Sequence, residues 1–258
     1  MNQNERREYL IKYLLKEEIR FGRQSIPADK QGQENLLRSL MNVRLPRPIS
    51  KYFLKIQDEY LTERNIERGI TDVDTLAPTK FDSRLYIWQG DITTLKCDAI
   101  VNACNSQMLG CFSPMHACID NFIHTYAGVE LRLKMHEIMT KQGHEEETGK
   151  AKITSGYNLP AKYVLHTVGP IIQWKVTQED ENLLASCYKE CLKLAADTGV
   201  ESIAFCCLST GVFRFPQQRA AEIATETVMQ FLKKDDRIKK VIFNVFKNED
   251  LEIYSHLL

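Results

Sequence analysis

Residues 84–106 read RLYIWQGDITTLKCDAIVNACNS. This stretch holds two short apolar runs, LYIW at 85–88 and AIV at 99–101, and each run leads into a turn or loop of Gly, Asp, Asn and Ser. Short apolar runs bounded by such residues are typical of buried strands. We therefore predict one buried strand before the GDIT turn and a second one after it.

The chain after these two strands alternates helices with strands. Further strands are predicted at KAKITSG, KYVLHTV, SIAFCCLS and 240–246. Helices are predicted at about 117–127, from there to about 141, and at about 180–197, 217–232 and 250–257. Strands separated by helices of this length need crossover connections, so the sheet should be largely parallel and covered on both faces. Ligands of such sheets bind beyond the carboxyl ends of the strands.

In the first 80 residues, the apolar side chains instead have the spacing of helices. Apolar side chains recur one turn apart within Tyr9–Leu14, Leu36–Leu40 and Tyr52–Tyr60. No cluster of His, Cys or Ser typical of catalysis occurs there, so we expect a packing role, with one wall of a cleft as the alternative. The predicted division is an N-terminal helical extension at 1–80 and a second domain at 81–258.

Composition and charge limit the class of protein. Hydrophobic residues make up 43% of the 258 residues and charged residues 26%, which is ordinary for a globular protein. Lys plus Arg and Asp plus Glu both total 34, so no global field attracts nucleic acid or a membrane surface. The charged N-terminus and the lack of a long apolar run predict a cytoplasmic protein, and we expect a monomer. Its eight cysteines should then be reduced thiols.

Three loops that follow predicted strands carry side chains suited to binding. Asp91 of GDIT could accept hydrogen bonds from an exocyclic amine, although such a turn is commonly only structural. Asn102 and Asn105 could satisfy sugar hydroxyls or serve turn chemistry. The stretch 209–213, STGVF, precedes a helix expected near Pro216, so its backbone N–H groups could hold a phosphate. No Lys-Ser or Lys-Thr follows its glycine, which excludes a Walker motif.

A closely spaced set of metal-binding side chains precedes the helix predicted at 117–127. Cys111, His116 and Cys118 lie within eight residues. Three protein ligands leave the fourth position of tetrahedral zinc open, as in catalytic sites. The spacing can also arise by chance, and a fourth ligand such as Cys104 would make the site structural. We predict one Zn²⁺ per chain in an open site.

The order of these motifs resembles the macrodomain family over nearly all of residues 84–258. The resemblance rests on GDIT, VNACNS, IDNFIH, TGKAKITSGYNLPAKYVLHTVGP and LSTGVFRFP, in that order. It implies a three-layer α/β/α fold with a mixed, largely parallel sheet, and an ADP-ribose cleft between the loop after VNACNS and the STGVF loop. Ordinary macrodomain hydrolases have a run of glycines where this chain has Cys111–Cys118. In this respect the chain resembles the zinc-containing macrodomains of bacteria and fungi, which also carry an N-terminal helical extension.

The resemblance implies a role for each matching position. The acid of GDIT contacts adenine, an aromatic residue after the last strand stacks on adenine, the asparagines contact the distal ribose, and the STG loop wraps the diphosphate. The implied ADP-ribose-binding residues are Asp91, Ile92, Asn105, Ser209, Thr210, Gly211, Val212, Phe213 and Phe246. The implied catalytic residues are Asp120, which would orient water or act as general base, and Asn102 and Asn105. The metal ligands are Cys111, His116 and Cys118.

These roles predict an enzyme that removes mono-ADP-ribose from modified protein side chains, with zinc as Lewis acid. A reader that binds ADP-ribosylated protein without cleaving it would need the same pocket but no open metal site. The resemblance also implies a possible target, because such macrodomains are associated with a sirtuin-type ADP-ribosyltransferase that acts on a lipoyl-carrier protein.

Several other polar residues allow two interpretations. His124 follows Asp120 by one helical turn and could support the site or simply pack. His166 is most simply a hydrogen-bonded core residue, and Cys187 and Cys191 are expected to pack. Arg214 could stabilise a diphosphate, although an arginine at a loop tip is more often solvated.

Overall fold

A six-stranded sheet forms the centre of the molecule in this computed structural model, which describes residues 1–17 and 25–258. Each neighbouring pair of strands is parallel except the pair at one edge, β6 and β5, which is antiparallel. In spatial order the strands are β2 (Leu85–Gln89), β8 (Lys240–Val245), β7 (Ser202–Phe205), β4 (Ala99–Cys104), β6 (Tyr163–Val168) and β5 (Ala151–Ser155). The predicted mixed, largely parallel sheet is confirmed.

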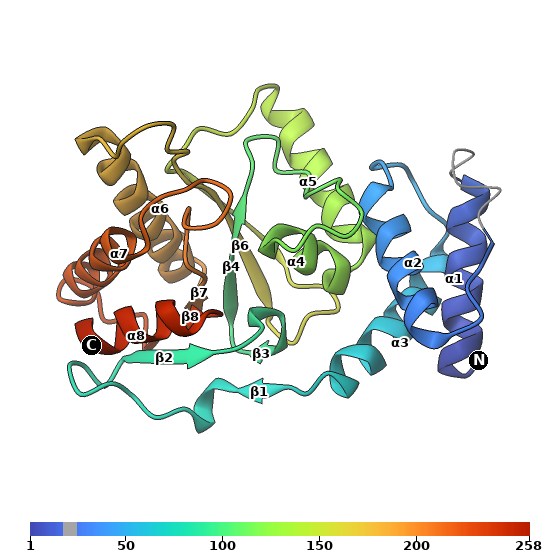
Figure 1. Cartoon of the computed structure of the whole chain (residues 1–258), viewed down its shortest axis with the longest axis horizontal. Helices are drawn as coiled ribbons and strands as arrows, with labels where there is room; N and C mark the ends of the chain where they lie inside the picture. Colours follow the sequence, from blue (N-terminus) through green and yellow to red (C-terminus); the bar gives the residue numbers. More distant parts are fainter. Residues whose placement is uncertain (18–24) are drawn as a thin grey trace.

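Helices cover both faces of this sheet, which makes the three predicted layers. Figure 1 shows α6, α7 and α8 gathered on one side of the sheet and α4 and α5 on the other. Their bounds are α4 (Ile119–Ala127), α5 (Val129–Gln142), α6 (Gln178–Asp197), α7 (Gln217–Leu232) and α8 (Asn248–Leu257). Within residues 1–17 and 25–258, none of the helices combines the length and the apolar character that crossing a bilayer requires.

The apolar runs at 85–88 and 99–101 lie in strands β2 and β4. Ile100 and Val101 in β4 are completely buried although they point to opposite faces, because helices lie on both sides of the sheet. One strand prediction was too long: SIAFCCLS at 202–209 leaves the sheet after Phe205. Ser209 has φ 63°, which no strand residue adopts.

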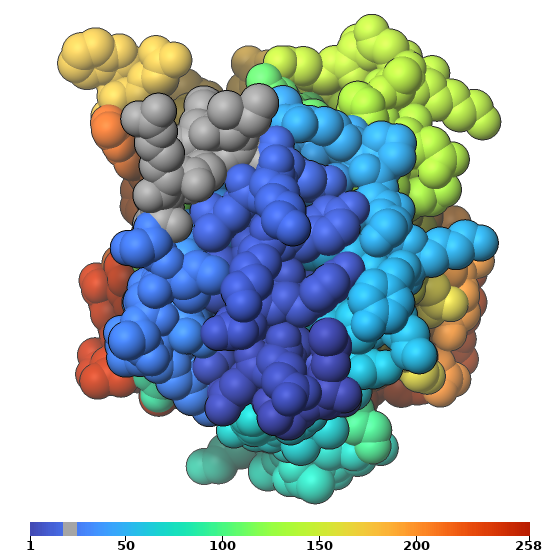
Figure 2. Space-filling model, turned by 90° about the vertical axis from the view of Figure 1, so that its right-hand side faces the viewer, coloured from blue at the N-terminus to red at the C-terminus, as the bar shows by residue number. Residues whose placement is uncertain are grey.

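The N-terminal extension is a bundle of three helices, α1 (Gln3–Glu17), α2 (Lys30–Val43) and α3 (Lys51–Glu67). Figure 2 shows these helices lying across one end of the molecule. Their apolar faces enclose a small core of their own, to which Val129 of the main domain also belongs. Val73 already belongs to the larger core, and β1 (Thr71–Asp72) pairs with β3 (Leu95–Lys96). Along the chain, the boundary between the extension and the main domain therefore lies before residue 73.

A buried arginine joins the extension to the main domain. Arg132 of α5 donates through Nη1 to the carbonyls of Met41, Asn42 and Arg44, at 3.1, 2.7 and 2.7 Å. Its Nε donates to the carbonyl of Leu109 at 2.7 Å. The carbonyls of Met41, Asn42 and Arg44 lie at the C-terminal end of α2, where the helix dipole favours a cation. Burial lowers the pKa of Arg132 to about 10, so the side chain remains charged near neutral pH.

Candidate active site

A cleft of about 590 Å³ lies at the carboxyl ends of the central strands. Its floor comes from residues at the ends of β4 and β7, including Ala103 and Cys206, and Phe246 follows the end of β8. Parallel strands bring these three loops to one edge of the sheet, where α/β proteins bind ligands. The volume is that of a small-molecule site.

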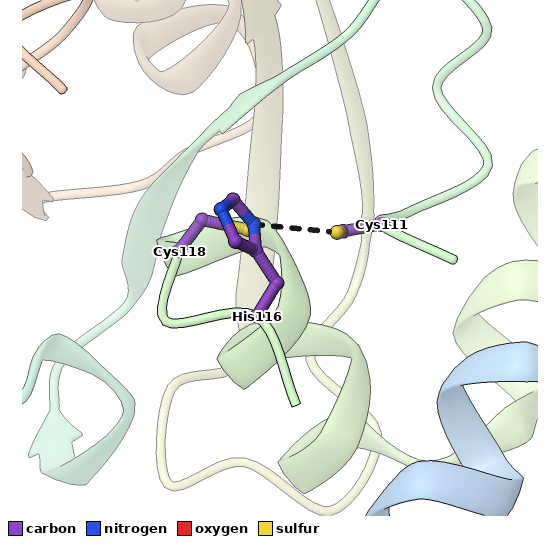
Figure 3. Close-up of side chains that lie close together, drawn as sticks. All are labelled: Cys111, His116 and Cys118. Atoms are coloured by element: carbon purple, nitrogen blue, oxygen red, sulfur yellow. Dashed lines mark hydrogen bonds between the residues drawn. The ribbon is translucent and has the colours of Figure 1, made fainter. Parts of the chain in front are cut away.

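Three side chains that could hold a metal ion, the Cys-His-Cys set, line the same cleft. The sulfurs of Cys111 and Cys118 and a ring nitrogen of His116 lie within 4.8 Å of one another, and all three residues line the cleft (Figure 3). Cys111 Sγ is 3.5 Å from His116 Nδ1. Tetrahedral zinc holds sulfur and nitrogen ligands at about 2.0–2.3 Å, which places ligand atoms roughly 3.5–4 Å apart. The Cys111–His116 distance lies in this range, so these side chains could together hold a metal ion.

Asp120 lies beside this Cys-His-Cys set, in the first turn of α4. Its carboxylate is buried, lines the cleft and accepts a hydrogen bond from Asn102 Nδ2 at 2.8 Å. His124 Nε2 is 3.5 Å from Asp120 Oδ1, without the geometry of a hydrogen bond. Burial raises the pKa of Asp120 to about 6. A carboxylate with a pKa this close to neutrality is suited to taking up a proton.

Asn102 lies behind Asp120 and not on the surface of the cleft. It is 0% exposed, and its Nδ2 is also 3.2 Å from His166 Nδ1 in the neighbouring strand β6. His166 Nε2 is 2.9 Å from the hydroxyl of Thr154, which confirms a hydrogen-bonded core histidine. Burial lowers the pKa of His166 to about 3, so its ring is neutral. Asn102 can therefore orient the Asp120 carboxylate. The resemblance had implied instead that Asn102 contacts the distal ribose directly.

Asn105 does line the cleft, where its side chain shapes the loop that leads to Cys111. Its Oδ1 accepts the Gln107 N–H at 3.1 Å and its Nδ2 is 3.4 Å from the carbonyl of Gly110. The amide thus performs turn chemistry, one of its two predicted roles, at the rim of the site.

The loop Ser209–Phe213 forms the opposite wall. Ser209 adopts φ 63°, and its buried hydroxyl has no hydrogen-bond partner within the described residues. A Cβ on Gly169 would lie 2.0 Å from Ser209 Oγ, so this approach requires glycine. By contrast, a Cβ on Gly211 would meet nothing within 4 Å, which leaves room above the loop for a ligand. Arg214 is exposed and lies outside the residues that line the cleft.

The third part of the cleft lies around the GDIT turn. Asp91 accepts hydrogen bonds from the N–H and hydroxyl of Thr93, at 3.0 and 2.7 Å, and forms an ion pair with Arg68, the residue after α3. Ile92 is buried beside it, and Phe246 is 75% exposed on the same cleft. An acid and an exposed aromatic ring are therefore available at one end of the site.

Cys104 does not join the Cys-His-Cys set in this structure. It lines the cleft, but its Sγ donates to the carbonyl of Thr167 at 3.2 Å and is not among the three ligand atoms that lie within 4.8 Å of one another. Cys187 and Cys191 are completely buried, as predicted for packing residues.

Comparison with known proteins shows the family of this chain. The Macro domain profile matches residues 101–224. The Protein-ADP-ribose hydrolase of Treponema medium is 56% identical over 260 residues and covers 100% of both chains. The chain belongs to the macrodomain family. A second Protein-ADP-ribose hydrolase, from Staphylococcus aureus strain MRSA252, is 50% identical over 97% of this macrodomain protein and 94% of its own length.

A solved macrodomain structure has the same fold. The Trypanosoma brucei macrodomain in complex with ADP-ribose is 28% identical, with a TM-score of 0.66, over 85% of this chain and 94% of that chain. The macrodomain fold predicted from the motif order is confirmed.

Some residues of the macrodomain cleft were not predicted. Asn244 lines the cleft and its Nδ2 donates to the carbonyl of Gly90 at 2.9 Å, so it holds the GDIT turn in place. A polar residue inside the apolar strand VIFNV was the available signal. Arg68 offered no signal, because its partner Asp91 is 23 residues away and no local pattern links the two.

Proposed function

We propose that this macrodomain removes ADP-ribose from modified protein side chains by hydrolysis, with a zinc ion held by Cys111, His116 and Cys118. The observation that supports this most strongly is the position of Asp120, a buried carboxylate on the same cleft wall as the three metal-binding side chains. The proteins from Treponema medium and Staphylococcus aureus that carry the name Protein-ADP-ribose hydrolase match it over nearly their full lengths.

The cleft offers a binding partner for each part of ADP-ribose. The exposed ring of Phe246 and the Asp91 carboxylate suit adenine at one end. Open space above Gly211 lets the Ser209–Phe213 backbone approach a diphosphate. The distal ribose then extends toward Asn105 and Asp120, at the end where the metal-binding side chains lie.

The residues at this end can perform the hydrolysis. When bound, zinc supplies a Lewis acid that lowers the pKa of an oxygen ligand. Asp120 accepts a proton from the attacking water, whose oxygen forms the new bond to the C1″ carbon. The bond from C1″ to the protein side chain breaks, and the proton that Asp120 took from the water passes to the departing side chain, which restores the carboxylate. Asn102 keeps the carboxylate oriented through its hydrogen bond.

The decisive experiment measures release of free ADP-ribose from proteins modified on acidic, serine or arginine side chains. A lipoyl-carrier protein belongs in this set, because the sequence resemblance suggests it as a target. We expect release that stops after chelation and returns when zinc is added back. Binding of ADP-ribosylated protein without any release would favour a reader. Full release by metal-free protein would remove zinc from the mechanism but leave the hydrolase in place.

A further inference from the structure

The loop that carries the metal-binding side chains is largely exposed. Residues 113–117, between Cys111 and Cys118, are all on the surface. An exposed loop has no apolar core to hold its shape, so polar anchors must do so. Three ligand atoms within 4.8 Å of one another require such anchoring, because metal binding depends on the orientation of each ligand.

Arg38, in helix α2 of the N-terminal extension, provides one anchor. Its Nη2 donates to the carbonyl of His116, itself one of the three metal-binding residues, at 2.9 Å. The same guanidinium donates through Nε and Nη2 to Asn121 Oδ1, at 3.0 and 2.7 Å. It also lies 4.2 Å from the centre of the Phe122 ring, which lines the cleft.

Asn121 extends this hydrogen-bond network to a second carbonyl of the loop. Its side chain is completely buried, and while its Oδ1 accepts from Arg38, its Nδ2 donates to the carbonyl of Ser113 at 2.8 Å. Two carbonyls of the exposed loop, at Ser113 and His116, are thus held by one connected pair of side chains.

We infer that Arg38 is a positioning residue through which the N-terminal helices fix the metal-binding loop. This inference rests on the proposed function, since it concerns the loop assigned to zinc. It gives the extension a role in the site itself, beyond packing against the main domain.

The chemistry of arginine explains the choice of residue. A planar guanidinium presents several N–H groups in a fixed fork, so it can bind Asn121 and His116 together while stacking on Phe122. A lysine side chain instead carries one ammonium group at the end of a flexible aliphatic chain. Arg38→Lys should therefore keep the charge but lose the simultaneous contacts.

Loss of Arg38 should leave the extension docked. Helix α2 is also held by Asn42, whose Nδ2 donates to the Thr125 hydroxyl at 2.7 Å, and by the three carbonyl contacts of Arg132. Arg6 provides a matched control, because it forms ion pairs with Glu59 and Glu63 inside the extension.

The experiment compares Arg38→Lys, Arg38→Ala and Arg6→Ala in the full-length protein. Zinc affinity is measured by competition with a chromogenic chelator, and the kcat and KM of ADP-ribose release are recorded separately. We expect both Arg38 variants to bind zinc about 10- to 100-fold more weakly, the usual effect of removing a residue that supports a metal ligand. The expected kinetic effect is on kcat, with KM nearly unchanged. Arg6→Ala should match the parent protein in zinc affinity.

Hydrogen exchange of the metal-free proteins separates this inference from the proposed function. Peptides covering 111–118 should exchange faster in Arg38→Ala than in Arg6→Ala, whether or not the protein proves to be a zinc enzyme. Parent-like exchange of this loop in Arg38→Ala would overturn the inference, as would parent-like zinc affinity in both Arg38 variants. A loss of zinc affinity that is equal in Arg6→Ala would also overturn it, because the effect would then be one of general stability.

Discussion

Asp120 illustrates how neighbouring residues prepare one side chain for chemistry. Burial raises its pKa to about 6, while the hydrogen bond from Asn102 favours the ionised form. Asn102 is in turn placed by the strand pairing of β4 with β6, where it lies opposite His166. A carboxylate held in this way is oriented before substrate arrives.

Substituting Asp120 by asparagine tests this role. Asp120→Asn keeps the shape of the side chain but cannot take up a proton, so turnover should fall by about 10²–10⁴-fold. Zinc content and ADP-ribose affinity should change little, and both are measured on the same preparation, by metal analysis and calorimetry. Turnover near the parent rate would mean that Asp120 is only a residue at a helix N-terminus. Loss of zinc would make it a ligand or a support of the metal.

Gly211 tests the phosphate-binding role of its loop. Its φ lies outside the left-handed region and an added Cβ would meet nothing within 4 Å, so Gly211→Ala should fold with an unchanged or slightly higher Tm. The methyl group would nevertheless occupy the space where a diphosphate approaches the backbone. We expect ADP-ribose affinity, measured by calorimetry, to fall at least about tenfold, or about 1.4 kcal/mol. Unchanged affinity would place the diphosphate elsewhere.

At the scale of elements, the metal-binding loop and helix α4 form one unit. Cys118 is the N-cap residue of α4, yet its side chain makes no capping hydrogen bond. The loop also lies outside both apolar cores. We therefore expect the fold to tolerate replacement of Cys118.

Cys118→Ala should consequently separate metal binding from folding. The parent protein should contain close to one zinc per chain, and the variant should lose most of it together with nearly all ADP-ribose release. Its far-UV circular dichroism and its unfolding transition should stay close to those of metal-free parent protein. Global unfolding of the variant would instead indicate a structural zinc.

At the scale of the whole molecule, the core of the extension includes Val129 of α5, and helices α2 and α3 pack against α4. Arg132 is the main polar link between the extension and the main domain, because four carbonyls from both parts accept hydrogen bonds from its buried guanidinium. The extension also reaches the cleft at two places, through Arg38 near the metal-binding loop and through Arg68 at Asp91.

Arg132→Ala should lower the free energy of unfolding by about 3–5 kcal/mol, because it leaves buried carbonyls without a donor. Urea denaturation followed by circular dichroism measures this change. Lys134→Ala is the control on the same helix: among the described residues, the Lys134 ammonium pairs with Glu137 at the surface, so its loss should change stability by less than about 0.5 kcal/mol. A loss below about 1 kcal/mol for Arg132→Ala would mean that the two cores are joined mainly by apolar contact.

The local sequence determined the elements and the motif order of this protein. Short apolar runs such as LYIW and AIV predicted buried strands, because the spacing of apolar residues along the chain indicates which side chains are buried. Cys111, His116 and Cys118 could be grouped because they lie within eight residues. The strand predicted at 202–209 is too long: it ends at Phe205, and Ser209, with a left-handed backbone, places its hydroxyl against Gly169, 40 residues away.

Only the tertiary structure decided which side chains meet across the chain. Asn102 was expected at the ligand, but strand pairing places it behind Asp120, where it contacts His166. Arg38 contacts Asn121 across 83 positions, and no local pattern marks such a pair. Periodicity reports whether a side chain is buried, whereas a contact between distant residues depends on how complete elements pack. The role of the extension at the site is therefore visible only in the folded molecule.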